Sequence, residues 1–230
     1  MNDFFITSLF FGGASCLITY QLGIYIQKKL KSKLFSPQVF SMAVIILFLL
    51  LFDVEYETFD AGAKYVSYLL TPATVCLALP LYEQFQILKK NALAILAGIL
   101  SGTLISAVTI LLLSMLFGLS HQEYVTLLPK SITTAIGMGV SEELGGIVSI
   151  TVASIVITGN LGNVIGPMVC KLFGIHEPIA KGIAMGTSSH VMGTSKAMEM
   201  GEAEGALGSL SIAVAGLITV IVAAVFAGLY

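Results

Sequence analysis

Asn91-Ala-Leu-Ala-Ile-Leu-Ala-Gly-Ile-Leu-Ser-Gly-Thr-Leu-Ile-Ser-Ala-Val-Thr-Ile-Leu-Leu-Leu-Ser-Met-Leu-Phe117 is the stretch that decides the fold class, because it contains no charged residue. About 20 mostly apolar residues are enough for a helix to cross the hydrocarbon core of a bilayer. The whole chain agrees: 57% of its 230 residues are hydrophobic, 10% are charged, and the mean hydropathy is +0.96. Because a soluble domain carries about 25% charged residues, we predict an all-α polytopic membrane protein.

Seven further apolar segments flank this stretch, which makes about eight in total. They cover residues 4–26, 34–52, 65–82, 125–140, 146–169, 179–198 and 206–230. The first segment has neither a basic start nor a small-residue cleavage site, so we expect a retained helix and not a signal peptide. We expect a single transmembrane domain over 1–230. Its predicted parts are a helical hairpin at 1–60 and repeat-like units at 61–120, 121–180 and 181–230.

The lysines predict the orientation of the chain in the membrane. Four lysines lie between residues 28 and 33 and two at 89–90, whereas the loop between these clusters carries four acidic residues and one lysine. Lysine-rich loops stay on the cytoplasmic side. We therefore expect a multi-pass protein of the bacterial cytoplasmic membrane with its N-terminus outside. A re-entrant segment would change the number of full crossings.

Three of the eight segments are poor membrane helices. Residues 70–80 contain two prolines, residues 129–139 start with proline and lysine and end in glycine, and residues 186–196 are mostly polar. Interrupted backbone survives at membrane depth only inside protein or beside a water-filled cavity. Interrupted helices in corresponding places also mark the substrate site of many transporters. We therefore expect the function to lie in these three broken or re-entrant helices.

The second and third broken segments resemble each other at an offset of 62 residues. Starting from Ala135 paired with Ala197, nine of nineteen positions are identical, among them Glu142 with Glu204. The first broken segment aligns more weakly, at an offset of 59. The pattern predicts a repeated unit made of a broken or short helix, an acidic turn and a full span. Parallel and inverted repeats both fit it.

Polar side chains in the broken segments and in the glycine-rich stretch 159–167 are candidate substrate-binding residues. They are Thr71, Thr74, Ser131, Thr133, Thr134, Asn160, Asn163, Thr187, Ser188, Ser189, His190 and Lys196. His190 is either a site for proton coupling or a packed histidine with its hydrogen bonds satisfied. Lys196 either receives a carboxylate or snorkels to the surface near Glu199. For Lys130 the favoured role is a membrane-edge anchor.

Several other classes of function have no support in the sequence. A net charge of −2 without any arginine argues against nucleic-acid binding. The three cysteines are widely spaced within apolar stretches and fit neither a disulfide framework nor a metal site. Because there is no nucleophile elbow, P-loop or metal-ligand spacing, we expect no enzyme activity and no cofactor. Two GxxxG pairs, at 98/102 and 162/166, favour close helix packing.

Three motifs carry a resemblance to a known family. Residues 73–82 (Ala-Thr-Val-Cys-Leu-Ala-Leu-Pro-Leu-Tyr), 128–136 (Leu-Pro-Lys-Ser-Ile-Thr-Thr-Ala-Ile) and 179–190 (Ile-Ala-Lys-Gly-Ile-Ala-Met-Gly-Thr-Ser-Ser-His) resemble the LrgB/CidB family. The stretch 193–199 is closest to its CidB-like branch. The resemblance runs over nearly the whole chain. It implies a holin-like or antiholin-like protein that modulates murein hydrolase activity, autolysis and programmed cell death beside a small LrgA/CidA-like membrane partner.

The same resemblance also implies transport, since related members move small carboxylates such as pyruvate, glycolate or glycerate. Our main expectation is a secondary transporter of small monocarboxylates, with membrane lipid around it and an LrgA/CidA-like partner; a homodimer is a further expectation by analogy. The alternative is an oligomeric regulator of cell-wall hydrolases that forms or blocks a lesion. A purely structural membrane anchor would leave the repeated polar segments unexplained.

Overall fold

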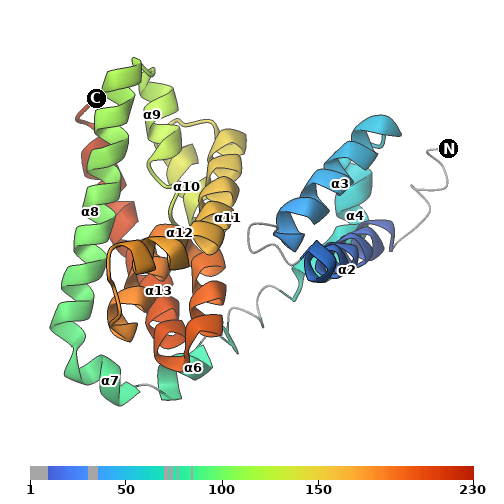
Figure 1. The fold of residues 1–230 in the computed structure, drawn as a ribbon. Helices are drawn as coiled ribbons and strands as arrows, with labels where there is room; N and C mark the ends of the chain where they lie inside the picture. The colour runs from blue at the N-terminus through green and yellow to red at the C-terminus, as the bar shows by residue number, and fades with distance from the viewer. Residues whose placement is uncertain (1–9, 31–35, 70–71, 73–74, 77, 84) are drawn as a thin grey trace. The chain divides into compact units, whose positions relative to one another are not determined.

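The computed structural model describes residues 10–30, 36–69, 72, 75–76, 78–83 and 85–230, and every regular element in these ranges is a helix (Figure 1). This confirms the predicted all-α fold. The chain divides into two compact units, residues 1–76 and 77–230. The boundary falls in the first predicted broken segment, where the candidate residues Thr71 and Thr74 lie outside the described residues.

The first unit contains three described helices, and α2 packs against both of the others. They are α2 (Phe11–Leu30), α3 (Pro37–Leu51) and α4 (Tyr56–Ser67). A Cβ on Gly12 of α2 would lie 2.5 Å from the backbone nitrogen of Ala63 in α4, so only glycine permits this crossing. The hydroxyls of Thr19 and Ser41 lie 2.6 Å apart and join α2 to α3. The polar contact between the two apolar helices satisfies both hydroxyls away from water.

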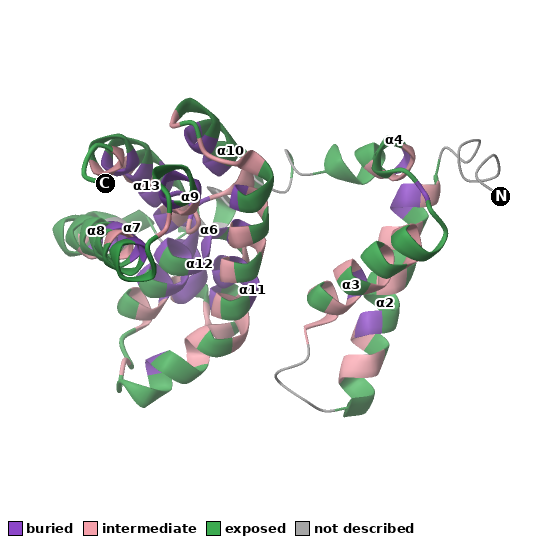
Figure 2. Ribbon diagram, turned by 90° about the horizontal axis from the view of Figure 1, so that it is seen from above, coloured by how far each residue is buried: buried purple, intermediate pink, exposed green. Residues whose placement is uncertain are grey.

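The second unit contains the remaining described helices. They are α6 (Ala78–Glu83), α7 (Phe85–Lys90), α8 (Ala92–Phe117), α9 (His121–Leu127), α10 (Thr134–Glu143), α11 (Val148–Leu172), α12 (Pro178–Met200) and α13 (Glu202–Ala227). Among the described helices, α8, α11 and α13 are long and apolar enough to cross a membrane. Large apolar side chains cover their outer faces, which Figure 2 shows as exposed; Leu93 and Leu172 are 84% and 80% exposed. Such faces are suited to lipid contact.

Helix α12 is packed between its neighbours through glycine contacts, which explains why a helix this polar lies inside the unit. Gly98 and Gly102 of α8 face Ile183 and Thr187 of α12, at 3.4 and 3.1 Å from an added Cβ. On another side of α12, a Cβ on Gly186 would lie 2.5 Å from the carbonyl oxygen of Gly208 in α13. Small residues at these positions let the backbones approach closely.

Two buried apolar clusters hold the helices of this unit together. One joins α8, α12 and α13 and contains Ile95, Ile99, Ile183, Ala206, Leu207 and Ala215. The other joins α8, α9, α10 and α13 and contains Ala107, Ile110, Tyr124, Val125, Leu128, Val140, Val222 and Ala223. The two clusters occupy successive parts of α8. The polar residues of the candidate site lie alongside α8 between them.

Candidate functional site

The second predicted broken segment is a pair of short helices with an irregular turn between them. Helix α9 ends at Leu127 and α10 begins at Thr134, so the chain from Leu128 to Thr133 is not helical. Pro129 supplies no N–H for a continuing helix, and Thr133 takes extended N-cap geometry at φ −63° and ψ 147°. The turn is held by backbone hydrogen bonds, including one from the Lys130 N–H to the Leu127 carbonyl at 3.1 Å.

The third predicted broken segment is a kink inside α12. Ser189 has φ −138° and ψ 19°, and His190 has φ 42° and ψ −133°, a conformation that L-residues rarely adopt. Such backbone strain costs about 1–3 kcal/mol. The surroundings stabilise it, because Nε2 of His190 lies 3.0 Å from the Ile155 carbonyl oxygen of α11. The His190 side chain is therefore a buried contact between α12 and α11.

Two glycines of α11 make room for this kink. A Cβ on Gly159 would lie 2.5 Å from Cε1 of His190, and Gly162 lies directly against the side chain of Ser189. Nearby, the Asn163 side-chain amide donates to the Met192 carbonyl at 3.1 Å and so satisfies a carbonyl just beyond the kink. The glycines and asparagine of the stretch 159–167 thus fit the shape and polarity of the broken backbone of α12.

A cleft of about 1080 Å³ lies along α8, α11 and α12. Its polar lining residues are Asn91, Ser101, Ser106, Lys130, Ser131, Thr158, Glu177, Thr187, Ser188 and Ser189. Most of the remaining lining is apolar. Both breaks contribute to it, the turn after α9 through Lys130 and Ser131 and the kink through Ser188 and Ser189. Concave, mostly apolar sites with a few convergent polar groups are typical of ligand-binding pockets.

Lys130 supplies the positive charge closest to the hydroxyls of the cleft. Its ammonium donates to Oγ of Ser131 at 3.0 Å, and that oxygen lies 3.5 Å from Oγ of Ser106. Among the described residues, no carboxylate is within ion-pair distance of Lys130. An ammonium that is partly withdrawn from water and lacks a counter-ion attracts an anion. The arrangement therefore suits the charged group of an acid.

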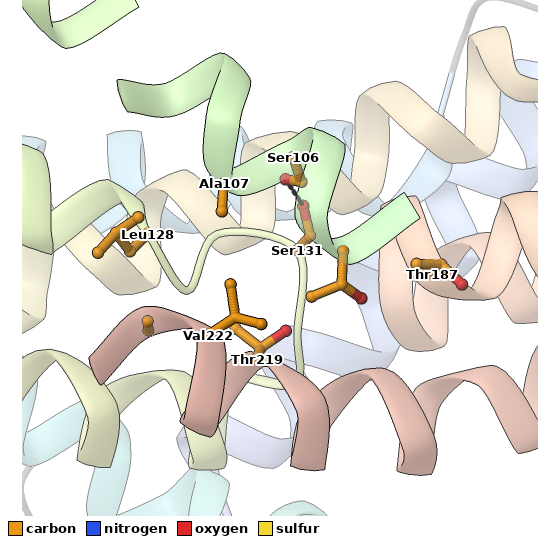
Figure 3. A pocket seen from close by; sticks show the side chains of 9 residues that line it. Ser106, Ala107, Leu128, Ser131, Thr187, Thr219 and Val222 are labelled. Atoms are coloured by element: carbon orange, nitrogen blue, oxygen red, sulfur yellow. Dashed lines mark hydrogen bonds between the residues drawn. The ribbon is translucent and has the colours of Figure 1, made fainter. Parts of the chain in front are cut away.

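A much smaller cavity of about 10 Å³ adjoins the cleft at Ser106, Ser131 and Thr187. Figure 3 shows its lining, with Ser106 and Ser131 joined across one side and Thr219 and Val222 of α13 on another. A volume of about 10–15 Å³ is needed to hold one water molecule. The cavity is thus at the size of a single water, and the open space of the cleft ends there.

Beyond this point the helices are tightly packed. Tyr124 is fully buried and its hydroxyl donates to the Phe226 carbonyl at 2.9 Å. Tyr230 packs edge-on against Tyr124 at a centroid distance of 5.2 Å, and its hydroxyl donates to the Leu119 carbonyl at 2.6 Å. Figure 1 shows the C-terminus at the same end of α8 as α9. The unit is therefore open along residues 91–106 of α8 and closed around the end of that helix.

The structure brings four of the predicted site residues to the cleft: Ser131, Thr187, Ser188 and Ser189. The other described candidates, Thr133, Thr134, Asn160, Asn163, His190 and Lys196, do not line it. Lys196 forms an exposed ion pair with Glu199 at 2.5 Å, which matches the surface alternative for that lysine. His190 and Asn163 act between α11 and α12, and the Nδ2 group of Asn160 donates to the Val156 carbonyl.

The sequence reasoning missed Lys130 as a cleft residue. It favoured a membrane-edge anchor, because Lys130 follows a proline at the expected boundary of a span. The structure places its ammonium in the cleft, where it donates to Ser131 beside Ser106 of α8. The position of the membrane boundary stays a prediction. A detectable signal was the position of Lys130 in an interrupted segment, where an ionisable residue is a functional candidate by default.

The chain is similar to one protein family over nearly its whole length. The model of the LrgB-like family matches residues 16–229. The antiholin-like protein LrgB of Bacillus mycoides (strain KBAB4) is 36% identical over 94% of this chain and 95% of its own length. The protein of the same name from Bacillus cereus (strain B4264) is 35% identical over the same shares. No solved structure matches.

Proposed function

Because this chain belongs to the LrgB-like family, we propose that it acts as an antiholin-like membrane protein that restrains murein hydrolase activity and autolysis. The observation that carries the proposal is the similarity to proteins named antiholin-like over 94% of the chain. The match includes both breaks and the cleft. In this proposal the protein works in the cytoplasmic membrane beside a small LrgA/CidA-like partner and performs no catalytic step.

Loss and restoration of the gene test this function. A strain that lacks it should lyse faster in detergent buffer and show stronger murein hydrolase bands in zymograms. The wild-type chain should restore slow lysis when it is returned at native level. Equal lysis curves with and without the chain would contradict the antiholin proposal. Co-purification with the LrgA/CidA-like protein from the same membranes tests the partner.

A second function, transport of small monocarboxylates such as pyruvate, glycolate or glycerate, is favoured by the cleft itself. Interrupted backbone lines it on two sides, and Lys130 offers one uncompensated positive charge among hydroxyl groups. A monocarboxylate neutralises this charge and accepts hydrogen bonds from Lys130 and Ser131, which are stronger than bonds between neutral groups. A protein that only covered or blocked a lesion would have no use for such a site.

The shape of the unit supplies a route for transport. The cleft is open along α8 from Asn91 to Ser106 and ends at the water-sized cavity and the cluster around Tyr124. Alternating access needs a site that opens to one side while the other side is closed. Substrate would enter near the starts of α8 and α12 and bind at Lys130. It would leave after the contacts of Tyr124 and Tyr230 open. Carboxylate movement of this kind could link the transporter to lysis control through metabolism.

Uptake into proteoliposomes separates the two functions. A transporter gives saturable uptake of labelled pyruvate or glycolate and retains an unrelated trapped solute such as sucrose. A lesion-forming regulator gives no saturation and lets sucrose escape. Vesicles without protein provide the background. Linear uptake up to high substrate concentration, equal to this background, would exclude transport of these acids and leave the antiholin function standing.

A further inference from the structure

Polar and apolar side chains are separated along the length of the cleft. On α12 the hydroxyls lie at 187–189, whereas the lining at 179–185 is apolar. On α11, Thr158 lies at one end and the lining at 161–170 carries no charged or hydroxyl side chain. On α8, the serines at 101 and 106 lie toward the closed end of the cleft. Each of the three helices therefore has a polar end at the closed end of the cleft and an apolar stretch next to it, and Asn91 and Glu177 lie beyond the apolar stretches of α8 and α12.

The packing contacts show that these three polar ends coincide. Thr187 of α12 faces Gly102 of α8, and Ser189 faces Gly162 of α11. One helical turn or more toward the start of α12, Ile183 faces Gly98 and Met185 faces Gly166. The polar ends meet at Lys130 and Ser131, at the closed end of the cleft. The apolar ends run together toward the starts of α8 and α12.

The cleft is far larger than a two- or three-carbon acid. Its extent from Asn91 to Ser106 along α8 is about 22 Å at 1.5 Å per residue, and its volume is about 1080 Å³. Pockets of roughly 300–1,000 Å³ already enclose ligands of drug size. A bound pyruvate would contact the corner at Lys130 and leave the apolar walls formed by Ile165, Ile179 and Ile183 without a partner.

Charge limits the ligand further. Lys130 is at the closed end, and the acidic residue that lines the cleft, Glu177, is the N-cap residue of α12 at the open end. A ligand with a single carboxylate therefore has a partner for its charge at Lys130. A second carboxylate at the other end of the molecule would lie against the apolar walls, where a charge without a partner is costly to bury, or, on a longer chain, near the like charge of Glu177.

We propose that the ligand of this cleft is a monocarboxylate with an aliphatic chain of about six to ten carbons, a medium-chain fatty-acid anion. Its carboxylate binds Lys130 and Ser131, and its chain lies against Ile183, Ile165 and Ile179 toward Asn91. The proposal rests on the carboxylate-transport function proposed above and assigns longer acids than those named there as its substrates. Burial of each methylene on these walls contributes to affinity, whereas glycolate and glycerate would occupy the polar corner alone and gain nothing from the walls.

Equilibrium binding of labelled acetate, butanoate, hexanoate and octanoate to the full chain in nanodiscs tests the proposal, with empty nanodiscs of the same lipid subtracted. Affinity should rise about fourfold per methylene, as burial of a CH2 group implies. Octanedioate should compete at least tenfold more weakly than octanoate. Lys130→Met should lower octanoate affinity at least tenfold, and Lys171→Met, at an exposed lysine outside the cleft, should leave it unchanged.

A second variant keeps the test independent of the folding of Lys130→Met. Ala184 is exposed and lines the apolar part of the cleft, so Ala184→Phe should weaken octanoate binding at least tenfold while butanoate binding changes less than twofold. Equal affinity for butanoate and octanoate, or octanoate binding unaffected by both variants, would overturn the chain-length proposal alone. Absence of binding and of uptake for every acid in the series and for pyruvate and glycolate would overturn carboxylate transport as well.

Discussion

Replacement of Gly159 by alanine should destabilise the kink of α12 and thereby lower the free energy of unfolding of the protein. The added Cβ would lie 2.5 Å from Cε1 and 2.6 Å from Nε2 of His190, so the ring must move. Movement breaks the 3.0 Å contact with the Ile155 carbonyl. Leaving a buried polar group unpaired costs about 1–3 kcal/mol, and overpacking a tight site costs about 1–3 kcal/mol. We expect a loss of about 2–6 kcal/mol in the free energy of unfolding.

The assay is reversible unfolding in mixed micelles, with helicity as the signal. Gly139→Ala is the matched control, because Gly139 is also helical and an added Cβ would meet nothing within 4 Å. This control should gain up to about 1 kcal/mol from the higher helix propensity of alanine. In a His190→Gly background, Gly159→Ala should be less harmful, since the ring it would displace is absent. If Gly159→Ala were as stable as Gly139→Ala, the described contact between α11 and the kink would be refuted.

Three further predictions follow from single contacts. Tyr124→Phe removes the hydrogen bond to Phe226 and should lower the free energy of unfolding by about 1 kcal/mol; an unchanged midpoint in the same micelle assay would contradict its role at the closed end. Lys196→Met should change stability by less than about 1 kcal/mol and leave carboxylate uptake at the wild-type rate, since its partner Glu199 is exposed. Hydrogen bonds from the backbone N–H and hydroxyl of Ser120 lower the pKa of Glu123 from 4.5. Because this folded-state pKa is depressed, its stabilisation is present above about pH 4.5 and lost as pH falls through the folded value. Glu123→Gln should therefore flatten the loss of thermal stability below that pH, and parallel pH profiles would refute it.

Much of the fold could be predicted from hydrophobic length. The predicted span 91–117 is α8 (Ala92–Phe117) within one residue, because uninterrupted apolar sequence fixes where a membrane helix runs. The break at 128–133 overlaps the predicted broken segment 129–139, and the kink at 189–190 falls inside the predicted segment 186–196, since proline and small polar residues disfavour helix. The count of eight segments remains a prediction: among the described helices, three meet the length and hydropathy needed for a span.

The contacts that assemble the site could not be predicted from the sequence. Gly162 and Ser189 are far apart in the chain, and only the packing of α11 on α12 brings them together. The repeat likewise remains a prediction, and its aligned glutamates differ in environment, since Glu142 is exposed and Glu204 is buried. The place of Lys130 in the cleft could not be predicted either, because a lysine beside a proline has the same local sequence at a membrane edge and in a turn that lines a cleft. Local composition therefore identified the segments, and tertiary packing decided which side chains share the cleft.

Saturable uptake of a labelled monocarboxylate by vesicles containing Lys130→Met, measured beside Lys171→Met at equal reconstitution, tests the central claim most directly. Lys130 is the lysine that lines the cleft beside the Ser131 and Ser106 hydroxyls, and Lys171 is exposed. A charge-assisted hydrogen bond contributes about 1.5–3 kcal/mol, so we predict that Lys130→Met raises KM about 10- to 150-fold while Lys171→Met matches the wild type. Equal KM values for both variants and the wild type would contradict the assignment of the cleft as the carboxylate site.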